Sequence, residues 1–455
     1  MTPLMDCLRH AAPSLQTQLL AVQQAASLTQ MVLAAWRLGL AVGLLVVREV
    51  LAQRAKAPTL WPNCPHCGTP LRSKGMVPRQ LTTLLGVLLW QRRVARCPKH
   101  CKIGLIAPLD TELGLTPHQQ TSDELKQLCC ALAVFVPFAT VTTLLSRLLP
   151  VAVSPTAIWC WVQEKGAVAM ARLSTELEQL AQGQPPTPEP LSEDHAALPL
   201  VLGADGVMVP FRRTAGSPKG RIVWREVKVA ILARLGRHTQ RNGQTVVRLE
   251  RRRLVAVLGD MDALKPRLWL EALRQGLQSA RVVVWLSDGG RGFWRFFAER
   301  LAGKAIGILD FYHAAQHLWE VAATWLDGRT KSAREWFVKV RHQLRHGSPE
   351  SVFEELVRAL EWEGLPAGAQ ATLRRVYNYL EHHRAHLDYA KFKELGLPLG
   401  SGMVESACKW LIQQRFKGVG MRWSEDGFNH LLHLRLAWVN GRFDTLFALE
   451  ASPNS

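Results

Sequence analysis

Three acidic residues occupy positions where a carboxylate could take part in catalysis. Asp205 lies in the middle of an apolar, strand-like run, Asp288 follows a second apolar run, and Glu405 falls in the first turn of a helix after a glycine-rich loop. An acid within an apolar strand costs free energy unless it is paired or binds a metal. Asp288 precedes Gly289 in a common turn pair, and a first-turn Glu often only favours its helix. Asp205 is therefore the most informative of the three.

The chemistry open to these acids depends on whether their chain segments meet. If the strands of Asp205 and Asp288 are neighbours, the two side chains lie ~5 Å apart. That separation suits two divalent cations roughly 3.5–4 Å apart, and oxygen ligands favour magnesium or manganese. Glu405 would close the site, and the N-terminus of its helix would help to keep that carboxylate ionised.

The elements that would position these acids follow from the pattern of apolar residues. The sequence predicts three β segments, then a helix, a strand, a helix, a strand and further helices. The predicted strands are Leu198–Val209, Ile222–Leu235, Thr245–Val257, Arg281–Leu286 and Ala305–Leu309. Such an order indicates an α/β unit with a mixed sheet, whose ligand sites lie at the carboxyl ends of strands. After His313 the chain is expected to be almost wholly helical.

Four of the nine cysteines form two short-spaced pairs, Cys64 with Cys67 and Cys97 with Cys101. Two and three residues separate the cysteines within the pairs, and 29 residues separate the pairs. Such spacing lets each tight turn present two thiolates to a tetrahedral Zn²⁺. His100 and, more weakly, His66 are alternative ligands. We expect structural zinc here, as against four free surface cysteines.

The N-terminal third is expected to be helical on both sides of the cysteine pairs. Met31–Val47 is apolar, but Arg37 interrupts it and it is shorter than the roughly 20 residues of a membrane span. It therefore predicts a buried or subunit-pairing helix, and no signal peptide is evident. Further on, Ala139–Leu149 and Thr156–Lys165, with Ser154 as N-cap, match a helix-turn-helix arrangement. DNA reading and an ordinary helical hairpin are equally open there.

The charge of the chain points to a polyanionic partner. The formal net charge is +19, and Arg212–Arg253 holds 13 basic residues and two acidic ones. Excess positive charge is typical of nucleic-acid binding, although a basic surface that binds nothing is the alternative. The predicted DNA contacts are Arg212, Arg213, Arg251, Arg252 and Arg253. Lys409, one turn after Glu405, would contact a phosphate or form an ordinary helix salt bridge; Arg415 and Lys417 are weaker candidates.

Five motifs stand in a fixed order along the chain: Gly203-Ala-Asp-Gly206, Leu286-Ser-Asp-Gly289, Leu309-Asp-Phe-Tyr-His-Ala314, Gly400-Ser-Gly-Met-Val-Glu405 and Arg422-Trp-Ser-Glu-Asp-Gly427. Together they resemble the Kra type of bacterial insertion-sequence transposases. The resemblance implies a DDE transposase with an RNase H-like catalytic core, in which Asp205, Asp288 and Glu405 are the three acids. They are separated by 82 and 116 residues, and residues 314–396 match a helical insertion before the last acid. Asp310 and His313 match a shared motif to which no chemistry is assigned.

These inferences give a multidomain prediction of class α/β plus α. The expected parts are a helical region (1–58), a zinc-ribbon-like module (59–120), a helix-turn-helix-like domain (121–181), a linker (182–197), the first part of the RNase H-like core (198–313), its helical insertion (314–396) and the C-terminal helices (397–455). The expected activity is Mg²⁺-dependent cleavage and strand transfer at terminal inverted repeats. Expected partners are double-stranded DNA and further subunits in the cytoplasm, at the nucleoid, without a membrane. The alternatives are a non-catalytic DNA-binding regulator and a metal-dependent nuclease.

Overall fold

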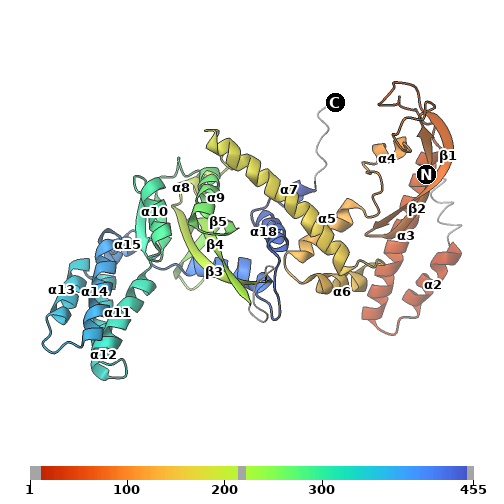
Figure 1. Ribbon diagram of the computed structural model, residues 1–455. Helices are drawn as coiled ribbons and strands as arrows, with labels where there is room; N and C mark the ends of the chain where they lie inside the picture. The colour runs from red at the N-terminus through yellow and green to blue at the C-terminus, as the bar shows by residue number, and fades with distance from the viewer. Residues whose placement is uncertain (1–11, 214–221, 448–455) are drawn as a thin grey trace. The chain divides into compact units, whose positions relative to one another are not determined.

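The computed structural model describes residues 12–213 and 222–447 (Figure 1). The chain divides into two compact units. The first comprises Met1–Lys165 together with Phe443–Ser455, and the second comprises Gly166–Arg442. All three predicted acids lie in the second unit, and the four paired cysteines lie in the first.

The first unit begins with two helices, α2 (Ala12–Gln23) and α3 (Leu28–Lys56). Ser27 separates them, because its side-chain oxygen caps α3 by accepting from the Gln30 N–H. The predicted helical region is thus broken at a position that the sequence pattern does not reveal. α3 is 29 residues long, with a mean hydropathy of 1.9 over its most apolar window, so its length and composition suffice to cross a membrane. None of that window is fully buried, although Leu44 and Val47 are half-buried against the chain's own hairpin.

A β-hairpin follows, made of β1 (Arg72–Thr83) and β2 (Gly86–Arg96). The two strands are antiparallel and meet at the Thr83–Gly86 pair, where Gly86 has a φ of 121° that a side chain would strain. Leu81, Leu88 and Trp90 form a small core with Leu51, so the hairpin covers the C-terminal end of α3.

The remaining helices of the first unit include the predicted helix pair. They are α4 (Pro108–Glu112), α5 (Asp123–Ala133), α6 (Phe138–Leu148) and the start of α7 (Pro155–Ala181). Val141, Ile158 and Val162 are fully buried, and Ser154 accepts from the Ala157 N–H at 3.1 Å as the predicted cap. α7 does not stop at Lys165 as expected but runs for 27 residues.

A five-stranded mixed sheet forms the middle of the second unit (Figure 1). Its strands are β3 (Leu200–Phe211), β4 (Val223–Thr239), β5 (Thr245–Leu258), β6 (Val283–Ser287) and β7 (Ala305–Leu309). Their order is β5-β4-β3-β6-β7, with β3, β4 and β5 antiparallel and with β6 and β7 parallel to β3. The predicted mixed α/β fold with an RNase H-like sheet is confirmed. The strands of Asp205 and Asp288 are neighbours.

Helices cover the sheet and extend away from it. Near the sheet are α8 (Glu193–Ala197), α9 (Met261–Arg274), α10 (Arg291–Arg300), α16 (Gly402–Ala407), the π-helical η2 (Cys408–Gln413), α17 (Gln414–Phe416) and α18 (Glu425–Val439). The predicted insertion consists of α11 (Phe311–Trp325), α12 (Lys331–His346), α13 (Pro349–Leu360), α14 (Ala367–His382), the 3₁₀ turn η1 (Arg384–His386) and α15 (Tyr389–Glu394). α11 to α14 pack against one another (Figure 1). Their buried side chains join those of the sheet in one continuous core. A short 3₁₀ turn, η3 (Asp444–Leu446), belongs to the first unit.

Candidate functional site

The structure brings Asp205 and Asp288 together across adjacent strands. β3 and β6 are paired in register up to Ala204 and Ser287, and the two acids are the residues that come next. The Ser287 hydroxyl donates to the Ala204 carbonyl at 3.3 Å, which fixes that register. Burial, aided by the charge of Asp288, raises the pKa of Asp205. The acids therefore interact electrostatically, as the strand pattern predicts.

Each of these two carboxylates has one oxygen held and one oxygen available. Asp205 Oδ1 accepts from the Gly206 N–H at 2.6 Å, and Asp288 Oδ1 accepts from the Gly290 N–H at 3.0 Å. Among the described residues no hydrogen bond to the Oδ2 atom of either acid is found. The backbone thus orients both groups and leaves an oxygen of each for a ligand.

Tyr379, on insertion helix α14, packs directly on the turn that carries Asp288. A Cβ at Gly289 would lie only 2.2 Å from the Tyr379 ring, so residue 289 must be glycine. Burial and the charges of Asp288 and Asp310 raise the pKa of Tyr379, which keeps its hydroxyl protonated. No sequence pattern points to this residue, because only the folded insertion brings it to Asp288.

Glu405 reaches the same face of the sheet from α16. A Cβ at Gly203 would lie 2.6 Å from Val404 Cγ2, so α16 rests on the bare backbone of β3. Gly203 and Asp205 are two residues apart in a strand and share one face. Buried Cys408 is close to both acids, since burial and the charges of Asp205 and Glu405 raise its pKa to about 12.

Glu405 is the most accessible of the three acids. Its side chain is 63% exposed and forms an ion pair with Lys409 at 2.8 Å, which is the helix salt bridge that the sequence left open. The carboxylates do not close around one point: among the described residues, only the four paired cysteines place three or more ligand atoms within 4.8 Å of one another. The site is therefore open on the side of Glu405.

Asp310 is level with Asp288 on the next strand and fastens the loop before α16. It follows β7, whose Leu309 is paired with Ser287, and it is 1% exposed. One carboxylate oxygen accepts from the His313 N–H at 2.8 Å, and the other accepts from the Ser401 N–H. The Phe311 N–H also donates to the Leu399 carbonyl at 2.9 Å. Asp310 thereby ties the α16 loop to the sheet.

His313 lies beside this arrangement on the first turn of α11. Its side chain is exposed, and its proximity to Asp205 lowers the pKa of that acid. Lys228 on β4 acts on Asp205 in the same way. Two basic groups from different elements thus act on the half-buried Asp205 carboxylate.

The predicted DNA contacts fall into two groups, those on β5 and those near the end of β3 and after α16. On β5, Arg251 and Arg253 are bound by other residues of the chain: Arg251 donates to the Pro190 carbonyl at 3.1 Å, and Arg253 pairs with Glu189 at 2.5 Å. Hydrogen bonds from Arg253 and Arg442 lower the pKa of Glu189 to about 2 against the opposing effect of burial. Arg252 is exposed and forms no ion pair with any residue that the structure describes.

The other basic candidates lie near the end of β3 and after α16. Arg212 is exposed, and its Nε donates to the Arg422 carbonyl at 3.3 Å; Arg213 lies next to it at intermediate exposure. Arg415 is only 2% exposed, and burial lowers its pKa to about 10. Arg415 is therefore a core residue and offers no surface charge. Lys417 lies over the Trp224 ring, with 5.5 Å between its Nζ and the ring centroid.

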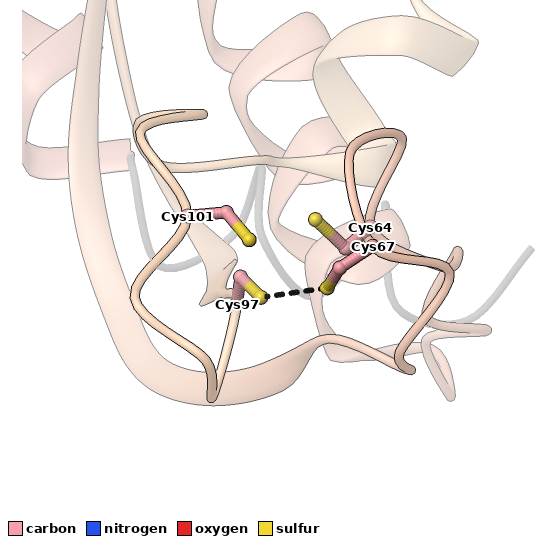
Figure 2. Close-up of side chains that lie close together, drawn as sticks. All are labelled: Cys64, Cys67, Cys97 and Cys101. Carbon is pink, nitrogen blue, oxygen red and sulfur yellow. Dashed lines mark hydrogen bonds between the residues drawn. The ribbon is translucent and has the colours of Figure 1, made fainter.

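The four paired cysteines converge as the spacing predicts (Figure 2). Their sulfur atoms all lie within 4.8 Å of one another, and the sulfurs of Cys67 and Cys97 are 3.5 Å apart. Hydrogen bonds with Thr69 lower the pKa of Cys67 to about 6, which favours a thiolate. Neither histidine alternative belongs to the cluster. The fourth ligand position is filled by Cys101.

Comparisons with known proteins do not identify a function for this chain. No family model and no curated protein matches the chain. One solved structure, the Drosophila P element transposase strand transfer complex, is similar over 74% of this chain and 83% of that chain, with 10% sequence identity and a TM-score of 0.26. A TM-score of that size does not establish a shared fold. The arrangement of the acids and cysteines is therefore the basis for a function.

Proposed function

We propose that this chain is a DDE transposase of an insertion sequence, of the Kra type, which cleaves DNA at terminal inverted repeats and joins the ends to a target. The observation that carries the proposal is the arrangement of Asp205 and Asp288 at neighbouring strand ends, with Glu405 exposed on the open side of the same site. They come from two adjacent strands and a helix on the same face, although 82 and 116 residues separate them along the chain. Asp205 and Asp288 are half-buried, and each has an oxygen without a hydrogen bond among the described residues, so a bound cation would offset the cost of placing two carboxylates side by side.

The residues present fit two Mg²⁺ or Mn²⁺ ions. Every available donor of the three acids is a carboxylate oxygen, which hard cations prefer. Cys408 is buried beside them, and burial raises the pKa of its thiol to about 12, which disfavours the thiolate in the metal-free chain. When bound, the two ions would supply Lewis-acid stabilisation of the attacking and leaving oxygens of a phosphoryl transfer.

The chain's own groups would bind and orient the DNA. His313 and Lys409 lie at the accessible edge of the carboxylates, where they would contact phosphates that flank the reacting one. Arg212, Arg213 and Arg252 would add contacts further along the backbone. In the first unit, the cysteine module and the α6–α7 pair would hold the inverted repeat. Phosphate contacts then give most of the affinity, with a strong dependence on salt.

The test uses DNA flanking the coding region as donor ends, a target plasmid and Mg²⁺. The wild type should give both cleaved ends and joined products. Asp205→Asn, Asp288→Asn and Glu405→Gln should each lose both products while still binding the ends. Cleavage without joining would indicate a nuclease, and binding with no Mg²⁺-dependent product from the wild type would indicate a regulator. Unchanged products from Asp205→Asn would refute the assigned site.

We also propose that Cys64, Cys67, Cys97 and Cys101 bind one structural Zn²⁺. Four sulfur donors in a compact cluster suit a closed tetrahedral site without a vacancy for substrate. Zinc measured on purified, reduced protein should approach one ion per chain. A zinc content near zero would contradict this part of the proposal without touching the carboxylate site.

Subunit pairing through α3 is a further part of the proposed function. Large apolar side chains on this helix are exposed, among them Leu28, Val32 and Trp36. A second subunit covering them would place two catalytic units on one DNA complex, at the nucleoid of the cytoplasm. Sedimentation of purified protein should give a dimer or a larger species, and an Ala substitution at Trp36 should weaken it. Recovery of the full chain only from membranes would favour a spanning role for α3.

A further inference from the structure

A large open groove lies beside the carboxylate site, and of its lining residues only Arg252 has so far been given a role, as a backbone contact. Its volume is about 1220 Å³, and its walls come from β4, β5, α16, η2 and α18. The lining residues that bear on ligand binding are Arg248, Arg252, Met403, Ser406, Trp410 and Trp438. Met403 and Ser406 flank Glu405 in sequence, so one helix borders both the groove and the catalytic acids.

The rim of the groove carries cations that are free to bind a ligand. Arg248 and Arg252 are exposed, and in residues 12–213 and 222–447 neither guanidinium forms an ion pair or a hydrogen bond. The neighbouring Arg251 is held by Pro190 and Glu189. One acid, Glu250, also lines the groove and lies 3.0 Å from His195. With Arg248, Arg251 and Arg252 against this single acid, the groove carries a net positive charge.

The walls of the groove offer aromatic and apolar surface. Trp410 and Trp438 are 37% and 40% exposed, which is high for indole rings. The Trp410 ring is held in place from behind by Arg435, whose guanidinium lies 4.9 Å from the ring centroid and donates to the Trp410 carbonyl. Arg435 is 2% exposed, so this support belongs to the core. Trp410 is thus a fixed ring that faces the groove.

A groove with a cationic rim and fixed indole rings matches the way proteins bind single-stranded nucleic acid, with phosphates on Arg and bases on aromatic rings. Its volume is close to that of pockets that enclose one small ligand, which leaves room for a few nucleotides and not for a duplex. We infer that this groove binds unpaired bases of the DNA strand that passes the carboxylate site, with Arg248 and Arg252 on its phosphates and Trp410 and Trp438 beside its bases. The inference rests on the proposed function for its DNA substrate.

The groove lies close enough to the carboxylates to hold the strand on which they would act. α16 is one helix wide, about 10 Å, so a strand leaving Glu405 can reach Met403 and Ser406 on the other flank within a few nucleotides. Bases held in the groove would keep the end of the duplex open beside the acids. A donor end with a frayed or single-stranded tip would then bind more tightly than a fully paired one.

The test compares a labelled duplex with a short unpaired tail and the same duplex with blunt ends, by fluorescence anisotropy without added Mg²⁺ or Mn²⁺ so that no cleavage occurs and the proposed zinc is retained. The tailed duplex should bind at least fivefold more tightly, since stacking contributes roughly 5- to 150-fold per base. The double variant Arg248→Ala/Arg252→Ala should remove most of that advantage and lower the salt slope by about 1.4, or 0.7 for each lost phosphate contact on a single strand. Arg241→Ala, which removes an exposed cation from the turn between β4 and β5 outside the groove, is the matched control.

A fluorescent base analogue tests whether the Trp410 ring stacks on a base of the tail. 2-Aminopurine in the tail should lose emission when it stacks, and Trp410→Leu should restore the emission while the circular dichroism spectrum stays that of the wild type. If Trp410→Leu misfolds, the arginine pair still decides the question. Equal affinity for the two duplexes, or an equal loss on both from the arginine variant, would overturn the inference. Asp205→Asn should still prefer the tailed duplex but should not cleave DNA. Cleavage by Asp205→Asn would overturn the proposed function and leave the inference about the groove standing.

Discussion

The close packing of α16 on Gly203 makes one substitution a sharp test of the assembled site. In Gly203→Ala the new methyl would lie 2.6 Å from Val404 Cγ2 and 2.9 Å from the Leu286 carbonyl oxygen. Carbon atoms pack at about 3.5–4.0 Å, so the helix must retreat by about 1 Å. Overpacking of this kind costs about 1–3 kcal/mol of stability. A 1 Å displacement of a catalytic group costs about 100-fold in rate.

The assay measures single-turnover cleavage of donor-end DNA with Mg²⁺, alongside urea unfolding. Gly203→Ala should lower the cleavage rate by about 100-fold at saturating enzyme, because Glu405 moves away from Asp205. The matched control is Gly402→Ala on α16 itself, where the added methyl meets nothing within 4 Å and the rate should hold. A fully active, normally stable Gly203→Ala protein would show that α16 does not rest on β3 as described, and the placement of Glu405 would fail with it.

Particular residues support three further predictions. Asp310→Asn should lower the cleavage rate at least tenfold without weakening DNA binding, because an amide in place of the carboxylate loses its charge-assisted bond to the Ser401 N–H; an unchanged rate would remove Asp310 as the fastener. Cys64→Ser should abolish zinc binding, whereas Cys160→Ser, at an exposed cysteine outside the cluster, should keep the zinc measured per chain. Burial lowers the pKa of His433 to about 4, whereas the unfolded chain has a histidine pKa near 6.5. The unfolded state therefore binds a proton first, and the free energy of unfolding falls as the pH drops from about 6.5 towards 4. Between pH 7 and pH 5 that loss is about 2 kcal/mol, and urea unfolding of His433→Leu should lack it.

Much of the second unit could be predicted from the sequence because its signals are local. Short continuous apolar runs predicted β6 and β7, and the change from strands to helices predicted the mixed sheet and the insertion. The pairing of the cysteines also followed from their spacing. Tyr379 could not be predicted, because its contact with Gly289 joins residues 90 positions apart through the folding of four helices. The break at Ser27 was missed since a single capping residue within an apolar stretch carries little signal.

The number of basic residues in the sequence does not show how many of them carry a charge that is free to bind a ligand. Of the 13 basic residues from Arg212 to Arg253, Arg234 is 2% exposed and donates to the Leu198 and Gln275 carbonyls, while Arg253 is held by Glu189. Such cations fix the sheet to its surroundings and cannot release counterions from DNA. A triple run of arginines therefore splits by position: Arg252 points a free charge outward, and its two neighbours are bound to the segment before β3. The exposed positive surface is smaller than the net charge indicates, and the part of it on β5 lies at the rim of the groove beside α16.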